Sequence, residues 1–316
     1  MLRLKYIWIV IGISSGIFTI RGQENQVIST ADITHFWEAY DQLATAQNRE
    51  DSLRIMQEQY IDRATEGFKE FLRVRDFTAE EYVKKIGRSP RFWQSVRAST
   101  EKIATRTQEV EEVVEKLRAA LPGFKNANIC FAIGGLRTGG TISDGWVLIG
   151  SEISASDSTA EKSELSPWLQ SVIGNTGDIV SMVAHEFIHT QQHSRGKSNL
   201  LTMSMGEGIA DFMTQIILGT NINAPIHPYG IDNECELWRL FQQDLENTPK
   251  NYTRWLYNGP TIKDRPADLG YFMGFRIAEA YYNKQNDKEK ALQTLLNYKK
   301  YKKVLKDSGY DGGCSR

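Results

Sequence analysis

Residues 183–189 of the chain have the sequence VAHEFIH. In a helix, His185 and His189 would lie one turn apart on the same face, so both imidazoles could reach a single metal ion. Glu186 follows the first histidine, and its carboxylate could hold a water molecule beside the ion without being a ligand. The apolar residues of the same stretch would bury this helix in the core. The spacing therefore predicts a helix that binds zinc, with Glu186 as a general base.

A catalytic zinc ion usually takes three protein ligands and keeps one position open. Glu207 follows His189 by 18 positions, which leaves room for a loop and the start of a second helix. Asp211 would share a face with Glu207 and could accept a hydrogen bond from a ligand histidine. The alternatives are solvated surface carboxylates at both positions, and an ordinary amphipathic helix that carries two histidines. We expect Glu207 to be the third ligand and Asp211 to orient a histidine.

A hydrolase of this kind also needs a group that stabilises the oxyanion of the reacting carbonyl. Tyr271 and His193 are the candidates, although Tyr271 could equally be a packed aromatic residue and His193 could merely cap a helix end. Arg276 could bind a substrate carboxylate or only form an ion pair with an acidic neighbour.

These residues resemble the gluzincins, the thermolysin-like zinc peptidases with a His, His, Glu ligand set. More narrowly, the chain is similar to predicted zinc-dependent proteases of Bacteroidetes related to the gliding-motility lipoprotein B family. That similarity extends to residues 139–150 and 269–276 and covers about the last two thirds of the chain. The gap between His189 and Glu207 is slightly shorter than in thermolysin, and there is no lipid-attachment cysteine. The resemblance implies a peptidase that uses Zn²⁺ and binds an extended peptide along an edge strand at residues 141–146.

Hydrophobic periodicity predicts an α+β fold that is mainly helical. Residues 28–121 have the spacing of amphipathic helices, the last of which is expected to run from Pro90 to Ala120. Strands are expected at residues 127–133 and 141–149, the second interrupted by a turn or bulge at Asp144 and Gly145. Helices then continue from Asp178 almost to Lys306. Asp178 would cap the start of the zinc-binding helix, and Arg195 with Gly196 would end it. Residues 122–316 are therefore predicted to form a zincin-like domain with a small sheet and C-terminal helices.

The N-terminus predicts export. Residues 1–23 combine a short basic start with an apolar run and a polar exit, which is typical of a signal peptide, or else of an uncleaved membrane anchor. The expected location is the periplasm, the cell envelope or the medium. Of the three cysteines, Cys130 lies in an apolar run and is expected to be buried. A disulfide between Cys235 and Cys314 would suit an exported protein, but the sequence does not decide the pairing.

Three functions fit these residues. The first is a zinc peptidase that acts on a peptide or protein substrate, with Glu186 as the base. The second is a non-catalytic envelope assembly or motility-associated protein that keeps the metal site. The third is a zinc hydrolase of non-peptide amides. The net formal charge of −1 does not indicate a basic surface that would bind nucleic acid. A membrane contact is expected only through an uncleaved N-terminal segment.

Overall fold

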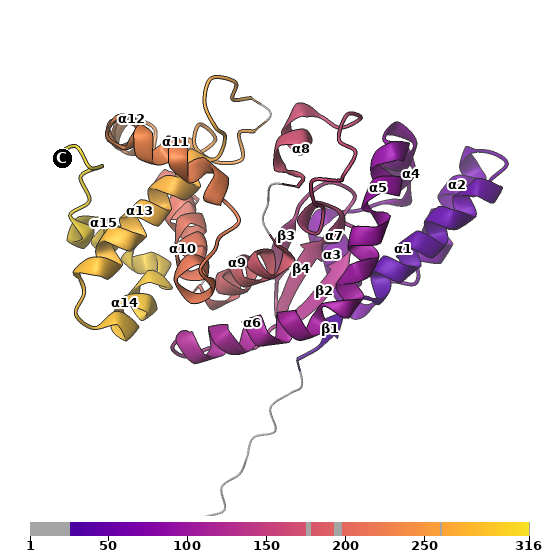
Figure 1. Cartoon of the computed structure of the whole chain (residues 1–316), viewed down its shortest axis with the longest axis horizontal. Helices are drawn as coiled ribbons and strands as arrows, with labels where there is room; N and C mark the ends of the chain where they lie inside the picture. Colours follow the sequence, from indigo (N-terminus) through magenta and orange to yellow (C-terminus); the bar gives the residue numbers. More distant parts are fainter. Residues whose placement is uncertain (1–25, 175–177, 193–197, 260, 316) are drawn as a thin grey trace, which may run out of the picture.

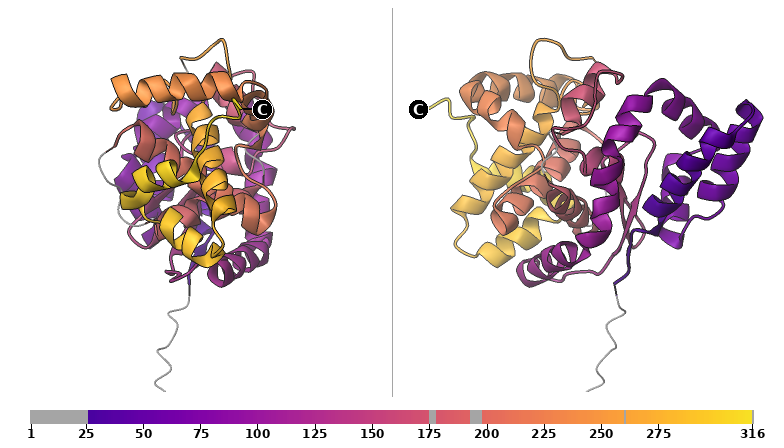
Figure 2. Two further views of the ribbon diagram at one scale, coloured as in Figure 1. Left: turned by 90° about the vertical axis from the view of Figure 1, so that its left-hand side faces the viewer. Right: turned by 45° about the vertical axis from the view of Figure 1, so that its right-hand side comes forward.

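A four-stranded sheet lies at the centre of the computed structural model, which describes residues 26–174, 178–192, 198–259 and 261–315. The predicted signal peptide at residues 1–23 lies outside these described residues. Figure 1 shows helices α1 and α2 at one end of the molecule and helices α13 to α15 at the other, with the sheet between them, and the views in Figure 2 agree. The expected fold class, α+β and mainly helical, is confirmed.

The sheet has the strand order β1-β2-β4-β3. Strands β1 and β4 pair in parallel with β2, whereas β3 pairs antiparallel with β4 and forms an edge. Gly145 adopts a φ of +72° in the turn between β3 and β4, a conformation that glycine tolerates without steric cost. The expected second strand is therefore a hairpin. The bounds are β1 Ile28–Ser29, β2 Asn128–Ala132, β3 Gly140–Ser143 and β4 Trp146–Gly150.

Helices dominate the chain before the sheet, although two expectations need correction. Ile28 pairs with Ile129 of β2, so residue 28 begins a strand and not a helix. The helix expected from Pro90 to Ala120 is two helices, because a 3-10 turn at Lys102–Thr105 follows the first and the backbone leaves helical angles at Arg106. The elements are α1 Ala31–Gln42, η1 Leu43–Thr45, α2 Arg49–Met56, η2 Gln57–Ile61, α3 Glu66–Arg75, α4 Ala79–Arg88, α5 Pro90–Glu101, η3 Lys102–Thr105 and α6 Thr107–Ala120.

Helices also fill the chain after the sheet. Helix α9 packs against strands β3 and β4 and against α6, and helix α10 packs closely against α13. The elements are α7 Ser151–Ser154, α8 Pro167–Val172, α9 Ile179–Gln191, α10 Leu200–Leu218, η4 Ala224–Ile226, α11 His227–Asp232, α12 Glu234–Asn247, α13 Leu269–Lys284, α14 Lys288–Leu295, η5 Tyr298–Lys300 and α15 Tyr301–Ser308. None of the described helices is long and apolar enough to cross a membrane.

Glycines allow α10 and α13 to approach one another. A Cβ atom added to Gly208 would lie 2.2 Å from the backbone nitrogen of Phe275, and one added to Gly274 would lie 1.8 Å from the carbonyl oxygen of Ser204. Side chains at these positions would force the helices apart. Because Glu207 precedes Gly208, this crossing positions a predicted metal ligand.

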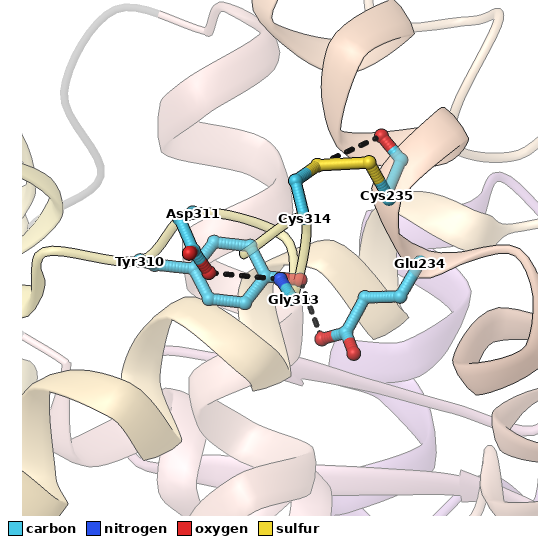
Figure 3. The surroundings of a disulfide bond; sticks show 6 residues. All are labelled: Glu234, Cys235, Tyr310, Asp311, Gly313 and Cys314. Atoms are coloured by element: carbon cyan, nitrogen blue, oxygen red, sulfur yellow. Dashed lines mark hydrogen bonds between the residues drawn. A yellow bond between two sulfur atoms is a disulfide. The ribbon is translucent and has the colours of Figure 1, made fainter. Parts of the chain in front are cut away.

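A disulfide joins Cys235 of α12 to Cys314, 79 residues later, so the pairing that the sequence left open is present. Figure 3 shows the surroundings of the bond, where the Tyr310 hydroxyl donates to Glu234 Oε1 at 2.7 Å. Cys130 is buried, as expected, and its thiol is free. Buried apolar side chains from Ile33 to Val304 form one cluster. The predicted division at residue 121 and the zincin-like character of residues 122–316 stay predictions.

Candidate metal centre and its cleft

Three side chains from two helices converge on one point. Helix α9 presents His185 and His189 one turn apart, and α10 presents Glu207. The Nε2 atoms of the two histidines lie 3.1 Å apart, and Glu207 Oε2 lies 3.1 Å from His189 Nε2 and 3.4 Å from His185 Nε2. All three side chains are buried. The sequence-predicted ligands therefore form a compact triangle of two imidazole nitrogens and one carboxylate oxygen.

This triangle has the size that zinc requires. Tetrahedral zinc with bonds of about 2.0–2.1 Å holds its ligand atoms about 3.3–3.4 Å apart. The observed separations of 3.1 to 3.4 Å are close to that value. Two neutral imidazoles and a carboxylate are also a ligand set that catalytic zinc sites use. Within the described residues, this is the one group of His, Cys, Asp and Glu side chains with metal-binding spacing.

Asp211 holds the first histidine, as expected. The Nδ1–H of His185 donates to Asp211 Oδ1 at 2.7 Å, which turns Nε2 toward Glu207. The amide of Asn223 donates to the other carboxylate oxygen at 2.8 Å, so Asp211 is itself fixed. Sequence reasoning missed Asn223, because nothing in the sequence relates its loop to α10. A carboxylate that orients a ligand histidine in this way also fixes its tautomer.

The buried cluster stabilises positive charge. Burial disfavours a charged imidazole, but the carboxylates of Asp211, Glu207 and Glu186 together outweigh it and raise the pKa of His185 to about 10. Burial likewise opposes the ionised form of Glu207, but the neighbouring histidines hold its pKa well below the usual range. A site with these properties is suited to a bound cation.

The second histidine is held by Gln192, which sequence reasoning also missed. His189 Nδ1 donates to Gln192 Oε1 at 3.0 Å, and Gln192 Nε2 donates to the carbonyl oxygen of Gly206 at 2.7 Å. Gln192 thus links the end of α9 to α10 directly before Glu207. Helix α9 ends at Gln191, earlier than the predicted end at Arg195 and Gly196, because Gln192 has extended backbone angles. Those two residues and His193 lie outside the described residues.

Tyr257 contacts the third ligand. Its hydroxyl donates to Glu207 Oε1 at 2.7 Å, while Glu207 Oε2 faces the histidines. The residue lies 50 positions after Glu207, between α12 and α13, and no local pattern in the sequence marks it.

Glu186 lies beside the triangle and against the edge strand. A Cβ atom added to Gly140 of β3 would lie 2.5 Å from Glu186 Cγ, so glycine at this position leaves room for the carboxylate. Both residues border a cleft of about 450 Å³ that also contains the three predicted ligands. The other residues that line the cleft are Arg75, Arg137, Thr138, Gly139, Thr141, Ile153, Trp168, Val172, Met182, Ile222, Tyr257, Asp268 and Tyr271.

Of the other residues that the sequence suggested for the site, Tyr271 lies in the cleft and Arg276 does not. Tyr271 lines the cleft, with its ring centroid 6.3 Å from that of His185, so it lies within the site. Arg276 does not line the cleft and instead pairs with Glu234 at 2.6 Å and with Glu279, so its expected alternative, an ion pair with an acidic neighbour, is the one observed. The edge strand predicted at residues 141–146 corresponds to β3, which ends at Ser143.

Comparison with known families gives one match. The family model of the gliding motility protein GldB matches residues 21–312, which is most of the chain. The chain therefore belongs to this family. Searches of the curated proteins and of the solved structures found no match. The GldB match bears out the narrower part of the sequence resemblance, the relation to a gliding-motility family. Zinc binding, hydrolysis and the gluzincin relationship stay predictions.

Proposed function

We propose that this protein is an exported zinc-dependent hydrolase of the cell envelope that cleaves peptide bonds and belongs to the gluzincin type. The observation that carries the proposal is the triangle of His185, His189 and Glu207 beside an open cleft, with a further carboxylate, Glu186, next to it. A structural zinc site closes its fourth position with another protein ligand and needs no adjacent base. Here three ligands and a cleft leave a position for water and substrate.

A zinc ion held there would polarise a substrate carbonyl and lower the pKa of a water molecule toward about 7. Glu186 borders the same cleft, where it accepts the proton of the attacking water and then delivers it to the leaving amine. Asp211 keeps His185 in the orientation that ligation needs. Tyr271 is the candidate donor to the developing oxyanion, because it lines the cleft beside His185.

The edge strand supports a peptide substrate. Strand β3 has β4 on one side, and its residues Gly140 and Thr141 border the cleft. An extended peptide can add to such an edge through main-chain hydrogen bonds, which places its carbonyl groups along the strand. An amide substrate without a peptide backbone would gain little from this edge, so the strand favours peptides over other amides.

The test is Glu186→Gln in the full-length exported protein, assayed with a library of internally quenched peptides. Gln keeps the shape of the side chain but cannot take the proton, and general-base catalysis contributes about 10²- to 10⁴-fold. We expect a loss of turnover in that range, with zinc content equal to wild type by elemental analysis. A zinc-loaded wild-type protein that cleaves no peptide, or a variant with full activity, would contradict the proposal.

Family membership favours a second function, which is a motility-associated role in the cell envelope without catalysis. In that case the metal would hold α9 and α10 together, and Glu186 would be dispensable. Cells that carry Glu186→Gln would then glide normally, whereas His189→Ala would weaken both metal binding and motility. Equal loss of motility in the two variants, with Glu186→Gln still stable and zinc-loaded, would instead favour hydrolysis as the reason for the motility role.

A further inference from the structure

The backbone of Tyr257 has a conformation that bulky residues rarely adopt. Its φ is +58°, in the left-handed region, where the Cβ atom of any residue other than glycine is crowded. Strained residues of this kind persist only when the surrounding structure imposes the conformation, and they concentrate at functional sites. Tyr257 is 52% exposed as a residue, so burial does not explain why the strain is retained.

The neighbours of Tyr257 are firmly held. Trp255 is 1% exposed, and its indole nitrogen donates to Asp244 Oδ2 at 2.8 Å. On the other side, the backbone N–H of Asp268 donates to Asn258 Oδ1 at 2.9 Å, and the N–H of Asn258 donates back to the Asp268 carboxylate at 3.3 Å. These contacts fix the chain before and after Tyr257. They direct its side chain into the cleft over Glu207.

The hydroxyl of Tyr257 gives the two oxygens of the Glu207 carboxylate different roles. Oε1 accepts the hydrogen bond from Tyr257 at 2.7 Å, and Oε2 is left 3.1 Å from His189 Nε2 and 3.4 Å from His185 Nε2. A free carboxylate can rotate and offer either oxygen or both. With Oε1 occupied, Oε2 alone completes the triangle of ligand atoms.

We propose that Tyr257 is a positioning residue for the metal site, and that its strained backbone is kept because it directs the hydroxyl onto Glu207. The inference rests on the zinc binding of the proposed function but does not depend on hydrolysis. Outer partners of metal ligands typically contribute about 10- to 100-fold to metal affinity. Because the partner here is a charged ligand and the bond is short, we expect Tyr257 to contribute in that range.

The first experiment measures the zinc dissociation constant by competition with a chromophoric chelator. Tyr257→Phe, which removes only the hydroxyl, should weaken zinc binding about 10- to 100-fold, with an unchanged melting temperature of the metal-free protein. Tyr252→Phe is the matched control on the same segment and should bind zinc like wild type. If wild type binds zinc and Tyr257→Phe binds equally well, the inference is wrong while the metal site stands. If wild type binds no zinc, the proposed function fails as well.

The second experiment tests the strain. Tyr257→Ala and Tyr257→Gly both lose the hydroxyl and the ring, so both should bind zinc about 10- to 100-fold more weakly than wild type. Glycine adopts a positive φ readily and alanine does not, so the glycine variant should have the higher melting temperature. A higher melting temperature for the alanine variant would show that the left-handed backbone is not strained, and would overturn that part of the inference.

Discussion

The close crossing of α10 and α13 makes Gly208→Ala an informative substitution. The added methyl group would lie 2.2 Å from the backbone nitrogen of Phe275 and 2.5 Å from the Cα atom of Gly274. Ordinary contacts of a Cβ atom begin at 3.4 Å, and the difference between 3.4 Å and 2.2 Å is 1.2 Å. The atoms it meets are backbone, so they cannot rotate away. The two helices must therefore separate locally by about this distance.

This separation should affect both stability and metal binding. Overpacking of this kind costs about 1–3 kcal/mol. The unfolding entropy of about 290 residues is roughly 0.6 kcal/mol per degree, so the clash by itself corresponds to a fall of about 2–5 °C in the melting temperature. Glu207 is the adjacent residue, and metal–ligand distances tolerate only about 0.2 Å. We therefore expect a loss of zinc affinity of more than about tenfold, the lower end of the effect of disturbing a ligand's support.

Gly206→Ala is the matched control on the other side of Glu207. A Cβ atom there would have Gln192 Oε1, at 3.9 Å, as its nearest contact. Both variants gain about 1 kcal/mol of helix propensity, so the difference between them isolates the clash. The measurements are thermal unfolding of the metal-free proteins and chelator competition for zinc. If both variants have the same melting temperature and zinc affinity, the crossing does not position Glu207 and the reasoning is refuted.

Three further predictions concern single features of the site and the fold. Asp211→Asn should weaken zinc binding about 10- to 100-fold by chelator competition. Both Asp211 oxygens accept hydrogen bonds, from His185 and from Asn223, and the –NH₂ group of the new amide would face one of these donors. Gly140→Ala should abolish peptide cleavage but keep zinc content in elemental analysis, because the methyl group would occupy the space of the Glu186 side chain. Replacing both Cys235 and Cys314 by serine should destabilise the protein by about 2–5 kcal/mol in denaturant unfolding, because the bond closes a long loop.

Each of these has a control and a contradicting result. Asp232→Asn, a substitution on α11, should leave zinc affinity unchanged, and equal affinity for the Asp211 variant would remove its orienting role. Gly87→Ala meets nothing within 4 Å and should keep full activity; an active Gly140 variant would mean that Glu186 needs no such space. For the disulfide, wild type under reducing conditions should match the double variant, and equal stability of the oxidised and reduced proteins would contradict the estimate.

Sequence patterns were informative wherever the relevant residues lie on one helix or in one turn. The four-residue spacing of His185 and His189 places both on one face of α9, whatever the rest of the fold does. Asp178 caps that helix as expected, since its side chain accepts from the backbone N–H of Ile179 at 2.8 Å. The turn at Gly145 and the burial of Cys130 were likewise predicted from their immediate neighbours.

Contacts between distant segments could not be predicted where no motif marks the residues. Tyr257 donates a hydrogen bond to Glu207, 50 positions away in the sequence, and Arg276 donates one to Glu234, 42 positions away. Such pairs depend on the angles at which helices cross and on the paths of the loops between them. The packing of many buried side chains determines both. Periodicity carries no record of these distances, and neither a bulky residue with a positive φ nor a glutamine that joins two helices has a sequence signature.

By itself, the sequence determined the fold class, the paired histidines with their adjacent glutamate, and the carboxylates that could complete the site. Those features follow from backbone periodicity, which acts over a few residues. Only the tertiary structure decided that the Glu207 carboxylate faces both imidazoles, and that Tyr257, Gln192 and Asn223 support the cluster. The reason is that α9 and α10 are brought together by close packing against their neighbours, including the contact between Gly208 and Gly274.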